Sequence, residues 1–193
     1  PGQRSLAETV YKAVSTGRCL MAQAPTGIGK TVGTIFPMLK ALAPQQLDKV
    51  FFLTAKTPGR KLALDAAQVL YDSSPNLPLR VLELVARDKA CEHLDKACHG
   101  DSCPLAKGFY DRLPAAREAA SRVRLLDQRN LREVALAHDV CTYYLSQEMA
   151  RWSDVVVADY NYYFDFGAML FGLAQLNQWR VAVLVEEGHN LVG

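Results

Sequence analysis

The apolar positions of the chain fall into short continuous runs, separated by longer stretches in which they recur at helical spacing. Continuous apolar runs are typical of strands that are buried on both faces, as in a parallel sheet covered by helices. The strands that we predict are residues 19–23, 50–54, 79–85, 154–159 and 181–185. The helices that we predict between them are residues 5–15, 30–42 and 60–71. This alternation of strand and helix predicts an α/β layered fold.

The alternation stops between residues 86 and 146, where no convincing strand pattern occurs. This stretch holds four of the five cysteines and one long candidate helix, residues 114–139, which is rich in Ala, Arg and Leu. We therefore predict a parallel-sheet domain formed by residues 1–85 and 147–193. A small helical domain, residues 86–146, is inserted into it.

Composition excludes several classes of protein. Half of the residues are hydrophobic and 22% are charged, which is typical of a globular domain and not of a disordered tail, a collagen-like fibre or a small disulfide-rich module. The formal charge of +2 is too small to indicate a nucleic-acid partner by itself. No apolar run reaches the roughly 18 residues of a membrane span, so we expect no membrane partner. Five cysteines are an odd number and nothing else indicates an oxidising compartment, so we expect cytosolic thiols or metal ligands rather than disulfides. As a separate expectation, the protein is located in a bacterial cytoplasm or associated with the nucleoid.

One segment has the pattern of a phosphate-binding loop. Residues 24–31 read A-P-T-G-I-G-K-T and lie between a predicted strand and a predicted helix, as such a loop requires. Gly27 and Gly29 let backbone N–H groups approach phosphate oxygens, and the helix N-terminus adds partial positive charge. Lys30 supplies a point charge for the β- and γ-phosphates, and Thr31 supplies a hydroxyl for Mg²⁺. The alternative is a glycine-rich turn that contains Lys-Thr by coincidence.

The last predicted strand ends in two acidic residues, Glu186 and Glu187. Ligands of parallel α/β sheets collect at the carboxyl ends of the strands. Carboxylates at this position can hold Mg²⁺ and orient an attacking water beside a bound nucleotide. The alternative is a solvated turn, but the presence of the phosphate-binding loop favours the functional interpretation.

Cys91, Cys98, Cys103 and Cys141 form a third candidate site, with 6, 4 and 37 residues between successive members. Four thiolates can close a tetrahedral zinc site or hold a [4Fe–4S] cluster. The tight cysteine pairs of most zinc sites are approached only by Cys98 and Cys103, so the spacing favours iron–sulfur over zinc or unrelated thiols. We expect Cys19, in the first predicted strand, to be a small buried hydrophobic residue.

Taken in order, these motifs resemble the XPD/DinG family of superfamily 2 DNA helicases. The resembling segments are residues 1–3 (the end of the Q-type motif), 24–31 (motif I), 53–57 (motif Ia), 84–91 (the start of the iron–sulfur domain), 103–112 (its continuation), 158–162 (the segment before motif II) and 186–190 (motif II). The chain departs from the family pattern at three positions. Glu186 stands where the family has Asp, Gly188 where it has Ala, and Thr142 where it usually has Pro.

The resemblance implies a RecA-like P-loop motor domain with a parallel sheet, interrupted by a small helical [4Fe–4S] insertion. It implies an ATP-dependent DNA helicase that translocates along single-stranded DNA from 5′ to 3′ and unwinds duplexes, as in DNA repair. The chain corresponds to the first motor domain alone, so we expect it to have little or no ATPase activity by itself. One alternative is a non-motor nucleic-acid-binding module with a degenerate nucleotide site. Another is a zinc-containing P-loop NTPase unrelated to DNA.

The resemblance also implies roles for individual residues, with ATP, Mg²⁺ and a [4Fe–4S] cluster as cofactors. The expected nucleotide-binding residues are Gln3, which reads adenine, Thr26, Gly27, Ile28, Gly29, Lys30, Thr31 and Glu186. The expected catalytic residues are Lys30 and Glu187, and Glu187 is expected to align the attacking water. The expected Mg²⁺ ligands are Thr31 and Glu186. The expected cluster ligands are Cys91, Cys98, Cys103 and Cys141. The expected DNA contacts are Thr54, Lys56, Thr57 and Arg87, and the partner is single-stranded or forked DNA bound by a monomer.

Overall fold

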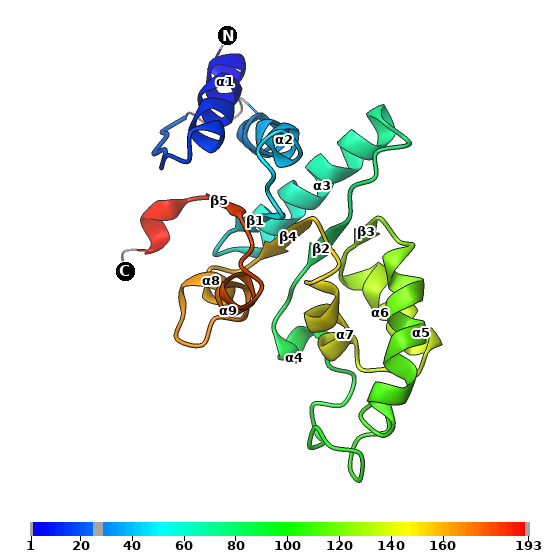
Figure 1. Ribbon diagram of the computed structural model, residues 1–193. Coiled ribbons are helices and arrows are strands. Elements are labelled where there is room, and N and C mark those ends of the chain that lie inside the picture. The colour runs from blue at the N-terminus through cyan, green and yellow to red at the C-terminus, as the bar shows by residue number, and fades with distance from the viewer. Residues whose placement is uncertain (1, 25–28, 192–193) are drawn as a thin grey trace. The chain divides into compact units, whose positions relative to one another are not determined.

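The protein is described by a computed structural model that covers residues 2–24 and 29–191 (Figure 1). Within these residues, five strands form one sheet in the order β3-β2-β4-β1-β5. The strands are β1 (Lys49–Leu53), β2 (Val81–Glu83), β3 (Leu125–Leu126), β4 (Val155–Ala158) and β5 (Val181–Val185). The pairs β1–β5 and β2–β3 are both parallel. The predicted α/β fold with a parallel sheet is confirmed.

The chain divides into two compact units. Unit 1 consists of Pro1–Leu77 and Val157–Gly193, and unit 2 consists of Pro78–Val156. The boundary at residues 156 and 157 falls within β4.

Unit 1 has its core around β1, whose residues are all buried because apolar side chains cover both faces of the strand. Its helical elements are α1 (Gly2–Ser15), α2 (Lys30–Leu42), α3 (Thr57–Ser73), α8 (Asn161–Phe164), α9 (Met169–Leu176) and the 3₁₀ turn η1 (Gly188–Leu191). Ile35 and Met38 face the core from α2, and Ala63 and Ala67 face it from α3. A proline in the first turn of α3 suits a helix start, where its missing N–H costs no hydrogen bond.

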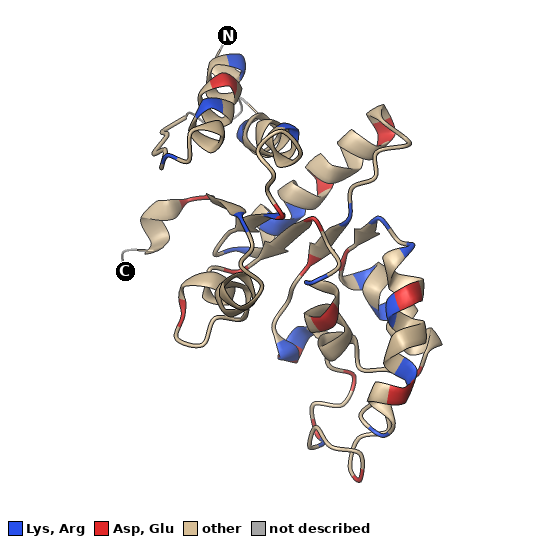
Figure 2. Cartoon of the chain, in the orientation of Figure 1, with Lys and Arg blue, Asp and Glu red and all other residues tan. Residues whose placement is uncertain are grey.

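Unit 2 is mainly helical. Its helices are α4 (Arg87–Ala90), α5 (Phe109–Ser121), α6 (Gln128–Ala137) and α7 (Thr142–Met149). Leu126, Leu131, Leu145 and Met149 form much of its core. Both acidic and basic residues occur along α5 and α6 (Figure 2). Arg132 donates to both carboxylate oxygens of Glu92 at 2.6 and 2.8 Å, so charges on this surface also pair with one another.

The predicted strand at residues 19–23 is wrong. Residues 18–24 have no regular secondary structure, and Met21 is 99% exposed. Cys19 is exposed too, so the expectation that it is buried is wrong. The run Cys-Leu-Met-Ala-Gln contains no β-branched or aromatic residue, and its apolar side chains favour a strand only weakly.

The predicted long helix at residues 114–139 is also wrong, because two helices, α5 and α6, occupy this region. Leu125 and Leu126 leave the helical path and pair with β2 as the short strand β3, which the apolar pattern did not predict. The Asp127 side chain then accepts a hydrogen bond from Asn130 N at 2.8 Å and caps the start of α6. A two-residue strand is too short to produce a recognisable pattern, and its partner lies far away in the sequence.

Candidate functional site

The carboxyl ends of β1 and β5 bring two of the predicted motifs together in unit 1. Leu53 lies opposite Val185 in the parallel register, and Glu186 N donates to Leu53 O at 2.9 Å. The segment that follows β1 and the acidic pair that follows β5 therefore leave the sheet at the same edge. This edge is where parallel sheets bind their ligands.

Glu186 also meets the start of α2. The Thr31 hydroxyl donates to Glu186 Oε1 at 3.5 Å, although 155 residues separate the two. Burial raises the pKa of Glu186 and the neighbouring Glu187 raises it further, whereas the Thr31 hydroxyl and Lys30 act in the opposite direction. A hydroxyl and a carboxylate are oxygen donors of the type that Mg²⁺ prefers, so the two residues fit the predicted metal position.

The described part of the phosphate-binding loop is held by contacts within the loop and with α1. Lys30 Nζ donates to Ala24 O at 3.1 Å. Gln3 Nε2 donates to Gly29 O at 3.2 Å, so the residue expected to read adenine contacts the loop backbone here. Gly29 has a φ of 72°, a backbone conformation that favours glycine, and a Cβ at this position would lie 2.6 Å from Gln3 Nε2 and displace that side chain. Three predicted nucleotide-binding residues lie outside the described residues: Thr26, Gly27 and Ile28.

Glu187 is positioned by three residues of unit 1. Its Oε2 atom lies 3.5 Å from Lys56 Nζ and accepts a hydrogen bond from Asn190 Nδ2 at 3.3 Å. The Tyr160 hydroxyl donates to the backbone carbonyl of Glu186 and lies 3.1 Å from that of Glu187. Burial is the main reason why the pKa of Tyr160 is raised.

Tyr160 and Asn190 lie within segments that resemble family motifs, but no individual role was predicted for them or for Gly59. A Cβ at Gly59 would overlap Thr54 Oγ1 and lie 2.7 Å from Glu186 Oε2, so only glycine allows the first turn of α3 to approach the acidic pair. The Thr-Pro-Gly sequence at the start of α3 was the available signal for this residue. For Tyr160 and Asn190, no local pattern indicates which backbone or carboxylate they contact.

The predicted DNA-contacting residues after β1 differ in exposure. Thr54 is buried, and Lys56 N donates to its hydroxyl at 3.5 Å. Lys56 and Thr57 are exposed, and the Thr57 hydroxyl accepts a hydrogen bond from Arg60 at 3.1 Å. In this segment, therefore, the Lys56 ammonium is the exposed positive charge beside the acidic pair.

The four predicted cluster ligands all lie in unit 2. Cys91 follows α4 directly and Cys141 precedes α7, and these two helices pack together. The pKa of Cys141 is raised mainly by burial, and nearby Cys91 and Cys103 raise it further. Arg87, on α4, donates to Cys98 Sγ at 3.2 Å. Among the described residues, no three His, Cys, Asp or Glu side chains lie close enough together to hold a single metal ion.

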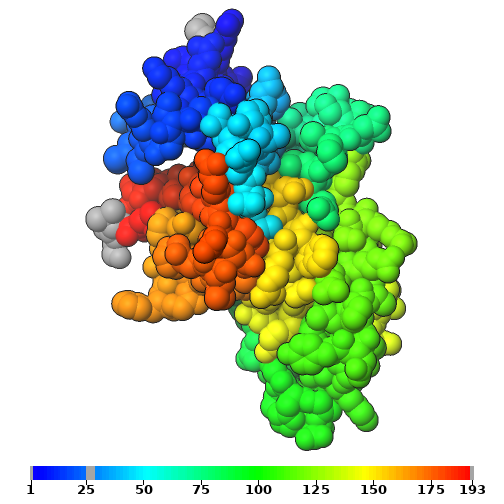
Figure 3. All heavy atoms as spheres, in the orientation of Figure 1, coloured from blue at the N-terminus to red at the C-terminus, as the bar shows by residue number. Residues whose placement is uncertain are grey.

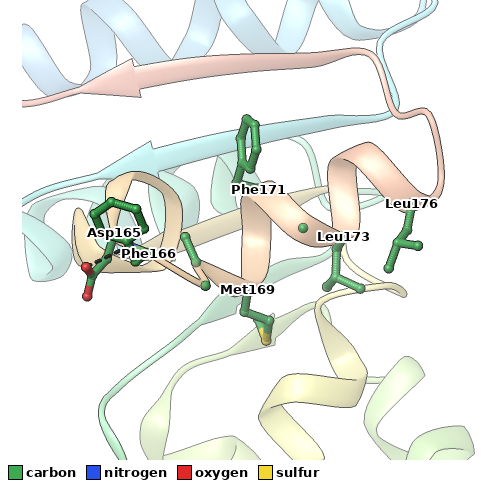
Figure 4. A pocket seen from close by; sticks show the side chains of 9 residues that line it. Asp165, Phe166, Met169, Phe171, Leu173 and Leu176 are labelled. Carbon is green, nitrogen blue, oxygen red and sulfur yellow. Dashed lines mark hydrogen bonds between the residues drawn. The ribbon is translucent and has the colours of Figure 1, made fainter.

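Unit 1 also has an apolar hollow beside α9, lined by Phe166, Met169, Leu173 and Leu176 among others (Figure 4). Phe166 is fully exposed and Leu176 is largely exposed. The segment that contains α9, orange in Figure 3, lies at the surface. None of the predicted site residues lines this hollow.

The chain matches two families of known proteins. Residues 2–126 match the DEAD/DEAH box helicase family, and residues 79–193 match the DEAD_2 family. The chain belongs to these helicase families. The predicted resemblance to XPD/DinG helicases of superfamily 2 is thereby confirmed. In the described residues, no helix of this helicase-family chain is both long and apolar enough to span a membrane.

The fold is also that of solved XPD structures. The chain is similar to a structure titled Truncated XPD, with a TM-score of 0.63 and 18% identity, over 96% of this chain and 52% of that one. It is similar to XPD_Helicase with a TM-score of 0.61 and 18% identity, over 98% of this chain and 32% of that one. A curated relative is the probable ATP-dependent RNA helicase YfmL of Bacillus subtilis (strain 168), 27% identical over 89 residues, or 46% of this chain and 23% of YfmL. The chain thus spans about half or less of each of these relatives.

Proposed function

We propose that this chain forms the ATP-binding motor domain of an ATP-dependent DNA helicase that moves along single-stranded or forked DNA from 5′ to 3′ as a monomer. The convergence of Thr31 and Glu186 carries this proposal, because it joins motif I to motif II at the ligand-binding edge of the sheet. The family membership supports ATP-dependent helicase chemistry. DNA as the substrate and the direction of movement follow from the resemblance to XPD/DinG helicases.

We propose a separate task for each residue of the site. Thr31 and Glu186 would hold Mg²⁺, which would neutralise charge on the phosphates of a bound ATP. Lys30 exchanges its contact with Ala24 O for oxygens of the β- and γ-phosphates. Glu187 aligns the attacking water through its carboxylate. Gln3, together with Thr26, Gly27, Ile28 and Gly29, completes the nucleotide-binding set that we propose.

We further propose that Cys91, Cys98, Cys103 and Cys141 hold a [4Fe–4S] cluster. The nearness of Cys91 and Cys103 to Cys141 supports this, as does the buried Thr142 hydroxyl beside Cys141, which has no hydrogen-bond partner within the described residues. The connection between α4 and α5 contains no helix or strand, and a cluster bound there would stabilise it in place of an apolar core. We propose residues 86–146 as this inserted domain, within a motor domain of residues 1–85 and 147–193.

Lys56, Thr57 and Arg87 are the exposed polar residues that we propose as contacts to the nucleic-acid backbone, with Thr54 positioning Lys56 through its hydroxyl. Lys and Arg side chains supply most phosphate contacts in such complexes. Lys56 belongs to unit 1 and Arg87 to unit 2, so each contact is tested by its own substitution.

A second candidate function is a non-motor nucleic-acid-binding module with a degenerate nucleotide site. The observation that favours it is Glu186, whose side chain is one methylene longer than the family's Asp and lies close to Gly59. In that case the protein would bind nucleic acid without hydrolysing ATP.

The deciding experiment measures ATP hydrolysis by the full-length protein without nucleic acid, with single-stranded DNA, and with single-stranded RNA of the same length. We expect stimulation by DNA and its loss in Lys30→Ala, whereas Lys40→Ala, an exposed lysine on the same helix, retains it. Stimulation by RNA alone would assign an RNA substrate, as the name of YfmL suggests for that protein. Binding of DNA without any hydrolysis would favour the non-motor module.

A separate measurement tests the cluster. We expect anaerobically purified protein to contain about four iron and four sulfide ions per chain. One zinc ion per chain and no sulfide would contradict the iron–sulfur proposal and support the zinc alternative.

A further inference from the structure

The carboxylate expected to align the attacking water is bound to a residue from a different motif. Glu187 Oε2 lies 3.5 Å from Lys56 Nζ, and Lys56 belongs to the exposed segment after β1. Asn190, from η1, donates to the same oxygen at 3.3 Å. The Glu187 side chain is therefore already engaged by two residues of unit 1.

Its neighbour Glu186 faces a different partner. The carboxylate of Glu186 lies against Thr31 at the start of α2, and that of Glu187 lies against Lys56. Glu187 has a φ of 53°, which is uncommon for a residue other than glycine and sets its side chain apart from that of Glu186. The Tyr160 hydroxyl contacts the backbone carbonyls of both glutamates, so the backbone is held while the Glu187 side chain can change partner.

We infer that Lys56 is a positioning residue that restrains Glu187 until a phosphate group of a bound nucleic-acid strand takes over the Lys56 ammonium. Glu187 is then released toward the nucleotide, and strand binding is coupled to ATP hydrolysis. This inference rests on the proposed function and adds to it a specific regulatory contact within unit 1.

The ion pair between Lys56 and Glu187 is weak enough for a phosphodiester to replace Glu187 as the partner of Lys56. The side chains of Lys56 and Glu187 are 65% and 48% exposed, and exposed ion pairs at this distance are weak and screened by salt. A phosphodiester offers the same ammonium a charged acceptor and competes for it directly. Asn190 is neutral, so its hydrogen bond to Glu187 adds no charge attraction that would hold the carboxylate in place.

The test uses Lys56→Gln in the full-length protein and measures ATP hydrolysis without any nucleic acid. We expect kcat to rise by up to about fivefold, which is the gain from releasing an exposed ion pair. The KM for ATP stays unchanged, because Lys56 contacts Thr54 and Glu187 and not the described part of the phosphate-binding loop. Lys56→Arg keeps the positive charge and retains the low rate. The matched control is Lys61→Gln, which removes an exposed lysine of α3 that pairs with Asp65 and leaves the rate unchanged.

Ionic strength gives a second, independent measurement. Salt screens the Lys56–Glu187 pair, so the rate of the unchanged protein without nucleic acid rises with salt relative to that of Lys56→Gln. A parallel salt response of the two proteins overturns the inference.

The outcomes also separate this inference from the function on which it rests. If the unchanged protein is stimulated by single-stranded DNA, and Lys56→Gln has an equal or lower rate without nucleic acid, the inference is wrong and the proposed function stands. If the unchanged protein hydrolyses no ATP under any condition, the proposed function is wrong and the inference falls with it.

Discussion

Thr31 and Glu186 lie within 3.5 Å of each other, although one begins the helix after the phosphate-binding loop and the other follows the last strand. Neither residue can reach the other through local structure. Their meeting depends on the parallel pairing of β1 with β5, which places Glu186 at the carboxyl edge of the sheet.

Glu186→Gln should weaken the binding of ATP in the presence of Mg²⁺. The amide lacks the negative charge that Mg²⁺ requires, and losses of about ten- to a hundredfold are usual when a residue of a metal site is changed. A titration with fluorescent ATP, with and without Mg²⁺, measures the effect. Glu8→Gln, an exposed glutamate on α1, is the control. Unchanged Mg²⁺-dependent affinity in Glu186→Gln would remove Glu186 from the metal site.

Gly59→Ala should destabilise unit 1 and lower ATP hydrolysis. The added Cβ would overlap Thr54 Oγ1 and press on Glu186 Oε2, so we expect a loss of about 1–3 kcal/mol in the free energy of unfolding. Urea denaturation measures this loss. Gly172→Ala is a matched control within α9, because a Cβ there meets nothing within 4 Å. Equal stability of the two variants would show that α3 has room to move away from Glu186.

Tyr160→Phe should lower kcat for ATP hydrolysis while the fold is retained. The substitution removes the hydroxyl that contacts the Glu186 and Glu187 carbonyls, at a cost of about 1 kcal/mol, which corresponds to a loss of about fivefold in rate. Steady-state kinetics measure the change in kcat, and circular dichroism checks that the fold is retained. Tyr11→Phe, on α1, is the control, and an undiminished kcat in Tyr160→Phe would argue against a positioning role.

Cys98→Ser should remove the cluster and disorder the connection between α4 and α5. The thiol that Arg87 contacts is lost, and one iron then lacks its protein ligand. Iron and sulfide analysis, limited proteolysis and single-stranded DNA binding measure the consequences, and we expect the loss of all iron, new cleavage in unit 2 and weaker binding. Cys19→Ser is the control, because Cys19 is exposed and lies in unit 1. Full DNA affinity in Cys98→Ser, measured by fluorescence anisotropy, would contradict a scaffolding role for the cluster.

The sequence predicted the parts of the fold that depend on local patterns. Continuous apolar runs such as residues 50–54 and 181–185 correspond to β1 and β5, because strands buried on both faces require apolar side chains at consecutive positions. The run at residues 19–23 failed because hydrophobicity alone does not make a strand without residues that favour one and a partner to pair with. The break between α5 and α6 was missed for a related reason, since it depends on the pairing of Leu125 with Val81.

The amino-acid sequence by itself determined the chemistry available to this protein: a loop with Lys30, an acidic strand end and four cysteines, in the order of a helicase family. Only the tertiary structure decided which of these groups meet. The contacts of Glu186 with Thr31 and of Glu187 with Lys56 depend on the register between β1 and β5 and on the space at Gly59. The physical reason is that side-chain chemistry is a local property of each residue. Distances between residues far apart in the chain are set by strand pairing and close packing, which no single segment encodes.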